Sequence, residues 1–350
     1  MVASVEIAGR KIGAGHPCFI VAEAGVNHNG DLKTARQLVD VAVEAGADAV
    51  KFQTFKAERL ATPSAPKALY QLQGTDKSES QLKMLQSLEL SEEAHRELSA
   101  YCRKQGILFL STPFDEASAD LLAGLGVPAF KISSGELTNL PFLRRVAGHG
   151  RPMIVSTGMS TLEEVESAVR TIGEVNRRGL VLLHCISLYP ADPSEANLRA
   201  MQTLSETFRL PVGYSDHTPG TTVSLAAVAL GACVIEKHFT LDRDLPGPDH
   251  RASLEPEELK DLVQGIRTVE KALGHGRKEP FPREMETAAV ARKSLVAARN
   301  IPAGSRLKEE FVTAKRPGTG LPPSWIGRVV GKEAARDIAE GTLLTPEMLK

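Results

Sequence analysis

Eight short β-rich runs that alternate with amphipathic segments constrain the fold of this chain more than any other feature. They recur at intervals of roughly 20 to 35 residues, which is typical of βα units around a parallel sheet. The runs span residues 19–26, 49–55, 107–114, 129–134, 153–157, 180–186, 212–217 and 234–239. Eight such units over about 270 residues predict an α/β fold, a (β/α)8 TIM barrel. An open doubly wound sheet would also alternate, but VNHNG follows the first run, not the GxGxxG of dinucleotide-binding folds.

The segments between the runs carry helix signals. Helical periodicity covers residues 32–45, 91–105 and 161–172. Ser91 is a predicted N-cap, and Ser160 with Glu163 three residues later predicts a capping box. Gly46 and Gly106 follow two of these segments, where glycine commonly ends a helix.

Two segments interrupt the alternation. Residues 56–90 are long and polar for a loop between a strand and a helix, and they predict short helices that form a lid or a wall of the site. Residues 274–293 are rich in Gly, Pro and charge, which indicates a linker. The expected organisation is therefore a barrel at 1–273, this linker, and a small β-rich second domain at 294–350.

Charge and cysteine content exclude several classes of protein. The chain has 42 basic and 43 acidic side chains, and this balance argues against a general nucleic-acid or anionic-membrane binder. Neither a signal-peptide pattern nor an apolar run of about 18 residues occurs. Cys18, Cys102, Cys185 and Cys233 form no CxxC pair, so we expect a reduced, cytoplasmic protein.

Polar residues in the eight runs fall mostly at the carboxyl ends. In a barrel these ends carry the chemistry, while the middles of the strands are packed core. Side chains two residues apart on a strand share a face. Three pairs can therefore point together into the barrel mouth: Lys51 with Gln53, Ser215 with His217, and Glu236 with His238.

Two lysines on the second and fourth runs, Lys51 and Lys131, predict an anion pocket. Hydroxyl groups that can surround them come from Ser111, Thr112, Ser134, Ser156 and Ser215. Ammonium groups neutralise a phosphate or carboxylate, and hydroxyls add directional hydrogen bonds. An alternative interpretation makes one lysine a Schiff-base nucleophile, as in barrel aldolases.

His217 and His238 end neighbouring strands, about 4.8 Å apart. Two imidazoles at that spacing can bind one divalent metal. With carboxylates nearby and no cysteine, the donor set suits an open site for Mn²⁺ or Mg²⁺ more than a structural zinc site.

The same residues lie in strings that resemble the sialic acid synthase (N-acetylneuraminate synthase) family. The strings are VAEAGVNHNG, AVKFQTFKAERL, LSTPFDEAS, FKISSGELTN, VSTGMS, LLHCISLYP, GYSDHTPG and IEKHFTLDRDLPGPDH. They occur in order over almost the whole chain, and TAKRPGTGL resembles the family's C-terminal antifreeze-like (SAF) domain. The resemblance implies a barrel followed by that domain, in a domain-swapped homodimer whose tail closes the partner's barrel.

The resemblance also implies roles for individual residues. Phosphoenolpyruvate would bind Lys51, Thr112, Lys131, Ser134, Ser156 and Ser215. The sugar would bind Gln53, Glu136, Tyr189, Asp249 and, from the partner subunit, Arg316. Glu23 would be the acid/base, and His217 and His238 would hold the metal, Mn²⁺ in the first place with Mg²⁺ or Co²⁺ as alternatives. Ser187 departs from members that have Asn there, so no role is assigned to it.

The implied reaction is condensation of phosphoenolpyruvate with the open-chain form of an N-acylhexosamine, with release of phosphate. N-Acetylmannosamine, the substrate of an N-acetylneuraminate synthase, is the first expectation. A legionaminate or pseudaminate synthase acting on a 2,4-diacetamido-2,4,6-trideoxyhexose is the alternative, and a Schiff-base lyase is a further one. An ice-binding module is not favoured, because the tail is rich in charge.

Overall fold

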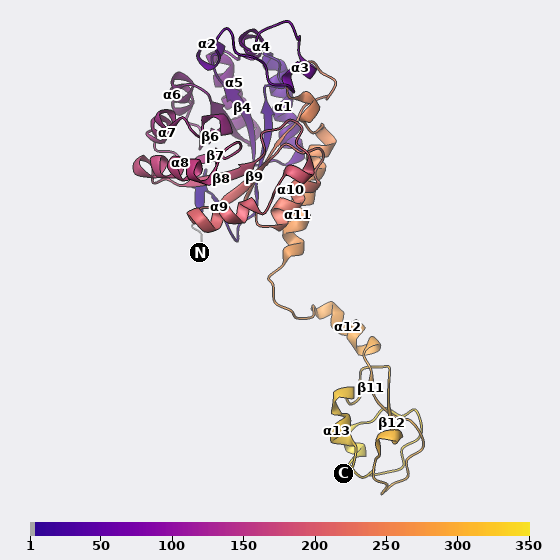
Figure 1. Cartoon of the computed structure of the whole chain (residues 1–350). Helices are drawn as coiled ribbons and strands as arrows, with labels where there is room; N and C mark the ends of the chain where they lie inside the picture. The colour runs from indigo at the N-terminus through magenta and orange to yellow at the C-terminus, as the bar shows by residue number, and fades with distance from the viewer. Residues whose placement is uncertain (1–3) are drawn as a thin grey trace. The chain divides into compact units, whose positions relative to one another are not determined.

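The computed structural model describes residues 4–350, which divide at Gly274 into two compact units. The first holds every strand of the predicted barrel, and the second runs from His275 to Lys350. Figure 1 traces the chain through both units. None of the helices described in this span is both long and apolar enough to cross a membrane.

The first unit is a nearly closed eight-stranded barrel, as the eight β-rich runs predicted. Its strands are β3 (Phe19–Gly25), β4 (Ala49–Thr54), β5 (Leu108–Pro113), β6 (Phe130–Ile132), β7 (Met153–Ser156), β8 (Leu180–Cys185), β9 (Val212–Asp216) and β10 (Val234–His238). They are parallel and ordered β5-β4-β3-β10-β9-β8-β7-β6. The two ends of this order, β5 and β6, lie against each other. All eight carboxyl ends therefore meet at one rim.

Helices pack around the strands (Figure 1). They are α1 (Leu32–Ala45), α5 (Glu92–Gln105), α6 (Glu116–Leu125), α7 (Leu140–Ala147), α8 (Leu162–Val175), α9 (Ala200–Phe208), α10 (Thr222–Ala229) and α11 (Pro256–Leu273). Ser91 caps α5 as predicted, accepting a hydrogen bond from the Ala94 amide. The predicted capping box of α8 was one residue early: it consists of Thr161 and Glu164.

An N-terminal hairpin closes the end of the barrel opposite the carboxyl rim. Its strands are β1 (Val5–Ile7) and β2 (Arg10–Ile12). Val5, Ile7 and Ile12 are buried in one apolar cluster with residues at the amino ends of the barrel strands, among them Phe19 and Val234. Apolar side chains therefore fill the barrel interior at this end.

Residues 56–90 form short helices, as predicted: α2 (Ala57–Leu60), α3 (Gln71–Gly74) and α4 (Gln81–Leu88). Three glycines permit the backbone of this segment to dock closely against its neighbours. The Gly247 amide donates to the Gly74 carbonyl at 3.0 Å. Gly30, with φ of +75°, would place a Cβ only 2.6 Å from the Ser87 carbonyl oxygen, so a side chain there would displace α4.

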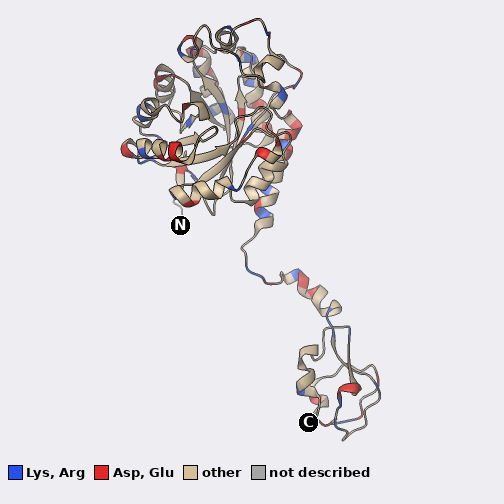
Figure 2. Cartoon of the chain, viewed as in Figure 1, with Lys and Arg blue, Asp and Glu red and all other residues tan. Residues whose placement is uncertain are grey.

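The second unit is small and has its own core. It contains α12 (Pro282–Ala291), an antiparallel pair β11 (Ser294–Ala297) and β12 (Val312–Lys315), and α13 (Ile326–Val329). Its buried apolar cluster includes Leu295, Ile301 and Leu344. The expected small β-rich domain is present, and the segment predicted as a linker contains helix α12. Acidic and basic side chains are interspersed over the helices of the chain (Figure 2).

Candidate active site

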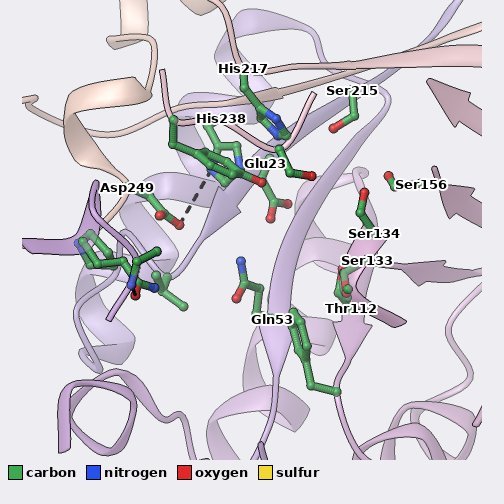
Figure 3. A pocket seen from close by; sticks show the side chains of 18 of the residues that line it. Glu23, Gln53, Thr112, Ser133, Ser134, Ser156, Ser215, His217, His238 and Asp249 are labelled. Atoms are coloured by element: carbon green, nitrogen blue, oxygen red, sulfur yellow. Dashed lines mark hydrogen bonds and ion pairs between the residues drawn. The ribbon is translucent and has the colours of Figure 1, made fainter. Parts of the chain in front are cut away.

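A cavity of about 490 Å³ opens at the carboxyl ends of the barrel strands. Twelve of the residues predicted from sequence line it: Glu23, Lys51, Gln53, Thr112, Lys131, Ser134, Ser156, Tyr189, Ser215, His217, His238 and Asp249. Figure 3 shows most of these side chains pointing toward one another. Strand polarity explains the convergence, because residues far apart in sequence occupy equivalent positions at one rim.

A buried carboxylate, Glu236, joins the two lysines at the floor of this cavity. Its carboxylate lies 3.6 Å from Lys51 Nζ and 3.3 Å from Lys131 Nζ, and Ser215 Oγ donates to it at 3.0 Å. Burial alone would raise the pKa of Glu236, but Lys131 and Lys51 outweigh that effect and lower it to about 2. The two lysines thus share this buried carboxylate, which holds both ammonium groups at the floor of the cavity.

No role was predicted for Glu236. The only available signal was its position two residues before His238, which places both side chains on one face of β10. Its two partners come from β4 and β6, so only the folded barrel reveals the cluster.

Glu23 lies beside Lys51 and is almost completely buried. Its Oε2 atom is 2.8 Å from Lys51 Nζ, and Lys51 also donates to Thr112 Oγ1 at 3.0 Å. Burial raises the pKa of Glu23 to about 7, despite the opposing field of Lys51. A carboxyl group with this pKa can exchange a proton near neutral pH, as an acid/base residue must.

One hydroxyl group contacts the second lysine, and another lines the same cavity. Lys131 Nζ donates to Ser156 Oγ at 2.8 Å, and the Gly158 amide donates to Ser134 Oγ at 2.9 Å. Ser111 was also predicted to belong to the anion pocket, and this was wrong. Ser111 lies on the opposite face of β5 from Thr112, where its hydroxyl forms a 2.7 Å hydrogen bond with the hydroxyl of Thr54.

The two histidines lie together at the rim, with ring centroids 5.6 Å apart. His217 Nδ1 hydrogen-bonds the Ile186 carbonyl at 2.6 Å, which leaves Nε2 for another partner. His238 Nδ1 is 4.0 Å from Asp249 Oδ2. Burial lowers the pKa of His217 to about 4 and that of His238 well below its usual value, so both imidazoles are neutral at pH 7.

An ion pair fixes the strands that carry these histidines. Lys237 Nζ lies 2.9 Å from Asp216 Oδ2, and both side chains are buried. Because alternate residues point to opposite faces of a strand, the pair lies behind the site, on the side of α10, where Ser224 also donates to Asp216. It therefore links β9 to β10 next to His217 and His238.

Helices from residues 56–90 form one wall of the cavity, as the length of that segment predicted. Tyr70 stacks on Tyr189 with ring centroids 4.8 Å apart, and Tyr189 in turn lies 4.1 Å from the His217 ring by centroid. Apolar side chains complete the wall: Leu60, Ala68, Met84, Leu85 and Leu88.

Two predicted sugar ligands are not among the residues that line the cavity. Glu136 lies in the 3₁₀ turn Ser134–Glu136, where its carboxylate accepts a hydrogen bond from Asn139 at 2.8 Å. Arg316 belongs to the second unit and is exposed there. Ser187, to which no role was assigned, does line the cavity. Sugar contacts by Glu136 and Arg316 remain predictions.

Comparison with known proteins decides the family. The family model described as NeuB family matches residues 38–278. The chain belongs to the NeuB family. A second model, the SAF domain, matches residues 292–350, so the small unit is the antifreeze-like domain that TAKRPGTGL indicated.

Several relatives of this NeuB-family chain are named as synthases. It is 50% identical to an N,N'-diacetyllegionaminic acid synthase of Legionella pneumophila over 97% of this chain and 96% of that protein. It is 39% identical to the human N-acetylneuraminate-9-phosphate synthase, with 97% and 95% covered. A solved N-acetylneuraminic acid synthetase from Leptospira borgpetersenii is 38% identical, with a TM-score of 0.73 over 82% of this chain and 95% of that one. The chain is accordingly an enzyme of this synthase type.

Proposed function

We propose that the enzyme is an N,N'-diacetyllegionaminic acid synthase. It would condense phosphoenolpyruvate with the open-chain form of a 2,4-diacetamido-2,4,6-trideoxyhexose. The observation that carries this choice is 50% identity over nearly the full chain to a synthase of that acid, against 39% to a neuraminate-9-phosphate synthase. The first expectation from sequence was N-acetylneuraminate synthase, and these identities favour the alternative instead.

Phosphoenolpyruvate would occupy the charged floor of the cavity. Lys51 and Lys131 would neutralise its carboxylate and phosphate, and Thr112, Ser134 and Ser156 would add directional hydrogen bonds. The ion pairs with Glu236 support this role over a Schiff base. A nucleophilic lysine must be neutral, whereas the neighbouring carboxylates Glu23 and Glu236, against the effect of burial, raise the pKa of Lys51. Burial lowers the pKa of Lys131, with Glu236 opposing that effect, so the case against a Schiff base at Lys131 rests on its ion pair with Glu236.

The reaction would then proceed at the carbon atoms above this floor. The C2–C3 π electrons of phosphoenolpyruvate form a bond from C3 to the aldehyde carbon, the C=O π pair of the aldehyde moves to its oxygen, which takes up a proton from water, and positive charge develops at C2. Glu23, as a carboxylate, would stabilise that charge and take a proton from the water that adds to C2. The tetrahedral product collapses to a ketone as the C2–O bond breaks and phosphate leaves.

His217 and His238 fit a divalent metal such as Mn²⁺. His238 Nδ1 is buried with no hydrogen-bond partner among the described residues, and burial raises the pKa of nearby Asp249 to about 6. A bound cation would give His238 Nδ1 a partner and would balance the negative charge of ionised Asp249. No set of three or more His, Cys, Asp or Glu side chains forms a complete metal cage within residues 4–350, so water or substrate would supply the remaining ligands. When bound, the metal would polarise the aldehyde carbonyl.

Chelation should abolish turnover if this metal is required. Added Mn²⁺ should restore the wild-type enzyme, but it should restore His217→Ala poorly because one imidazole ligand is missing. Phosphate release after EDTA treatment and metal addition measures both. Full activity in excess EDTA would contradict the metal assignment.

A substrate panel tests the function itself. The purified enzyme is mixed with phosphoenolpyruvate and the diacetamido-trideoxyhexose, N-acetylmannosamine or N-acetylmannosamine 6-phosphate, and released phosphate is measured. The trideoxy sugar should give the highest kcat/KM. Equal or better turnover of N-acetylmannosamine would return the assignment to an N-acetylneuraminate synthase. A covalent adduct trapped by borohydride would indicate a Schiff-base lyase.

We also propose that Arg316 reaches the sugar in the partner's barrel of a domain-swapped homodimer. A small domain of this size has a marginal core and gains stability by docking on a large surface. Mixing two inactive variants, Glu23→Ala and Arg316→Ala, should restore activity after subunit exchange, because one of the two sites regains both residues. Unchanged inactivity despite demonstrated exchange would mean that the tails do not cross.

A further inference from the structure

Helix α4 directs one face into the cavity. Gln81, Met84, Leu85 and Leu88 all line it, and their spacing of i, i+3, i+4 and i+7 is that of one helical face. Three of these four side chains are apolar. In most amphipathic helices such a stripe is covered by the protein core, whereas here part of it borders the candidate active-site cavity.

A small apolar cluster supports this face. Met84 and Leu88 are buried together with Val26 and Phe55, and Leu60, Leu85 and Phe114 pack against them. The C-terminal end of α4 is held by the close contact of Ser87 with Gly30. Figure 1 shows α4 grouped with α2 and α3 above the barrel strands. The face is therefore backed by packed side chains and a fixed backbone contact.

Charge is distributed unequally around the cavity. Among the described residues that line it, the lysines are Lys51 and Lys131, both from barrel strands at the floor. None of the lysines and arginines of the 56–90 segment lines the cavity. Lys67, for example, is engaged by Glu79 at 2.7 Å. The wall formed by α4 therefore offers no cation to a phosphorylated sugar.

We propose that the α4 face, centred on Leu85, is the subsite for the far end of the aldose and selects an apolar group there. The proposal rests on the proposed function and extends it to specificity. With phosphoenolpyruvate on the lysines and the aldehyde near Glu23 and His217, the remaining carbons of the sugar extend toward the wall. A methyl group at C6, which N-acetylmannosamine lacks, can be buried against Leu85, Leu60 and Phe114.

The same wall disfavours the competing sugars. A 6-hydroxyl group would lose its hydrogen bonds to water without a replacement, and a 6-phosphate would be placed against an apolar surface with no counter-ion. When two substrates differ by one small group that contacts an apolar pocket, their kcat/KM values usually differ by about 10- to 200-fold. The face would thus exclude N-acetylmannosamine 6-phosphate more strongly than N-acetylmannosamine.

The test replaces Leu85 with Ala. We expect kcat/KM for the diacetamido-trideoxyhexose to fall about tenfold or more, while kcat/KM for N-acetylmannosamine and the KM for phosphoenolpyruvate change less than threefold. Leu69→Ala is the matched control, because Leu69 lies in the same segment, is 84% exposed and does not line the cavity. Equal losses with both aldoses, or none with either, would overturn the proposal.

A second variant tests the charge argument directly. Leu85→Lys adds a cation to the wall and should improve use of N-acetylmannosamine 6-phosphate at least tenfold relative to N-acetylmannosamine. An unchanged ratio would count against the subsite. Calorimetric measurement of trideoxy-sugar binding distinguishes failure of this proposal from failure of the proposed function. If the sugar binds, if Leu85→Ala weakens that binding and if no phosphate is released, the subsite is supported and the proposed reaction is not. Sugar binding that is absent, or insensitive to Leu85→Ala, overturns the subsite whatever the phosphate assay gives.

Discussion

Glu23→Gln should lower kcat by about 10²- to 10⁴-fold, the usual contribution of a positioned acid/base group. The amide keeps the shape of the carboxyl group but cannot take a proton from the attacking water. Lys51 loses one of its carboxylate partners, so its attraction for phosphoenolpyruvate should not weaken. The KM for phosphoenolpyruvate should therefore stay the same or fall. Steady-state phosphate release at saturating aldose measures both constants.

Glu174→Gln provides the matched control for that change. Glu174 pairs with Arg144 at the surface, with half of its side chain exposed, so the same chemical substitution there should leave kcat unchanged. Thermal unfolding of both variants excludes loss of fold as the cause. A Glu23→Gln enzyme that retains a third or more of the wild-type kcat would remove Glu23 from the acid/base role.

The barrel was predictable because its strands are buried on both sides. Such strands read as continuous apolar runs, and runs such as 180–186 are visible without any knowledge of tertiary contacts. The N-terminal hairpin was missed because its strands have only three residues each, too few for a recognisable alternation. Its role depends on Ile7 and Ile12 reaching the amino ends of strands that come much later in the chain.

Site residues could be predicted from sequence wherever the parallel direction of the strands alone places a side chain at the carboxyl rim. Lys51, Lys131 and the two histidines had to meet at one rim once the barrel was assumed. Ser111 was misplaced because adjacent residues on a strand face opposite sides, and a run of two hydroxyls does not reveal which one points inward. A wall from residues 56–90 was predicted, but not which face of α4 enters the cavity, since that depends on contacts such as the one between Gly30 and Ser87.

Lys131→Met should raise the KM for phosphoenolpyruvate about 30- to 150-fold, equivalent to about 2–3 kcal/mol for a lost hydrogen bond to a charged group. The KM for the aldose should change much less, because the sugar would lie toward the histidines and α4. Lys51→Met should act in the same direction. Ser156→Ala removes only the hydroxyl partner of Lys131 and should have a smaller effect. Equal effects on both substrates would argue against a dedicated phosphoenolpyruvate pocket.

Glu236 makes it possible to separate binding from folding in that experiment. In Lys131→Met the buried Glu236 loses its nearer cation and retains Lys51 at 3.6 Å and the Ser215 hydrogen bond. Removing one partner of a buried ion pair can cost up to about 3–5 kcal/mol of stability. The double variant Lys131→Met/Glu236→Gln removes that charge and should recover much of the lost stability in urea unfolding. Its KM for phosphoenolpyruvate should nevertheless remain high, because the ligand's counter-charge is still missing. If KM instead returned to the wild-type value together with stability, Lys131 would act only by balancing Glu236, and it would not bind the substrate.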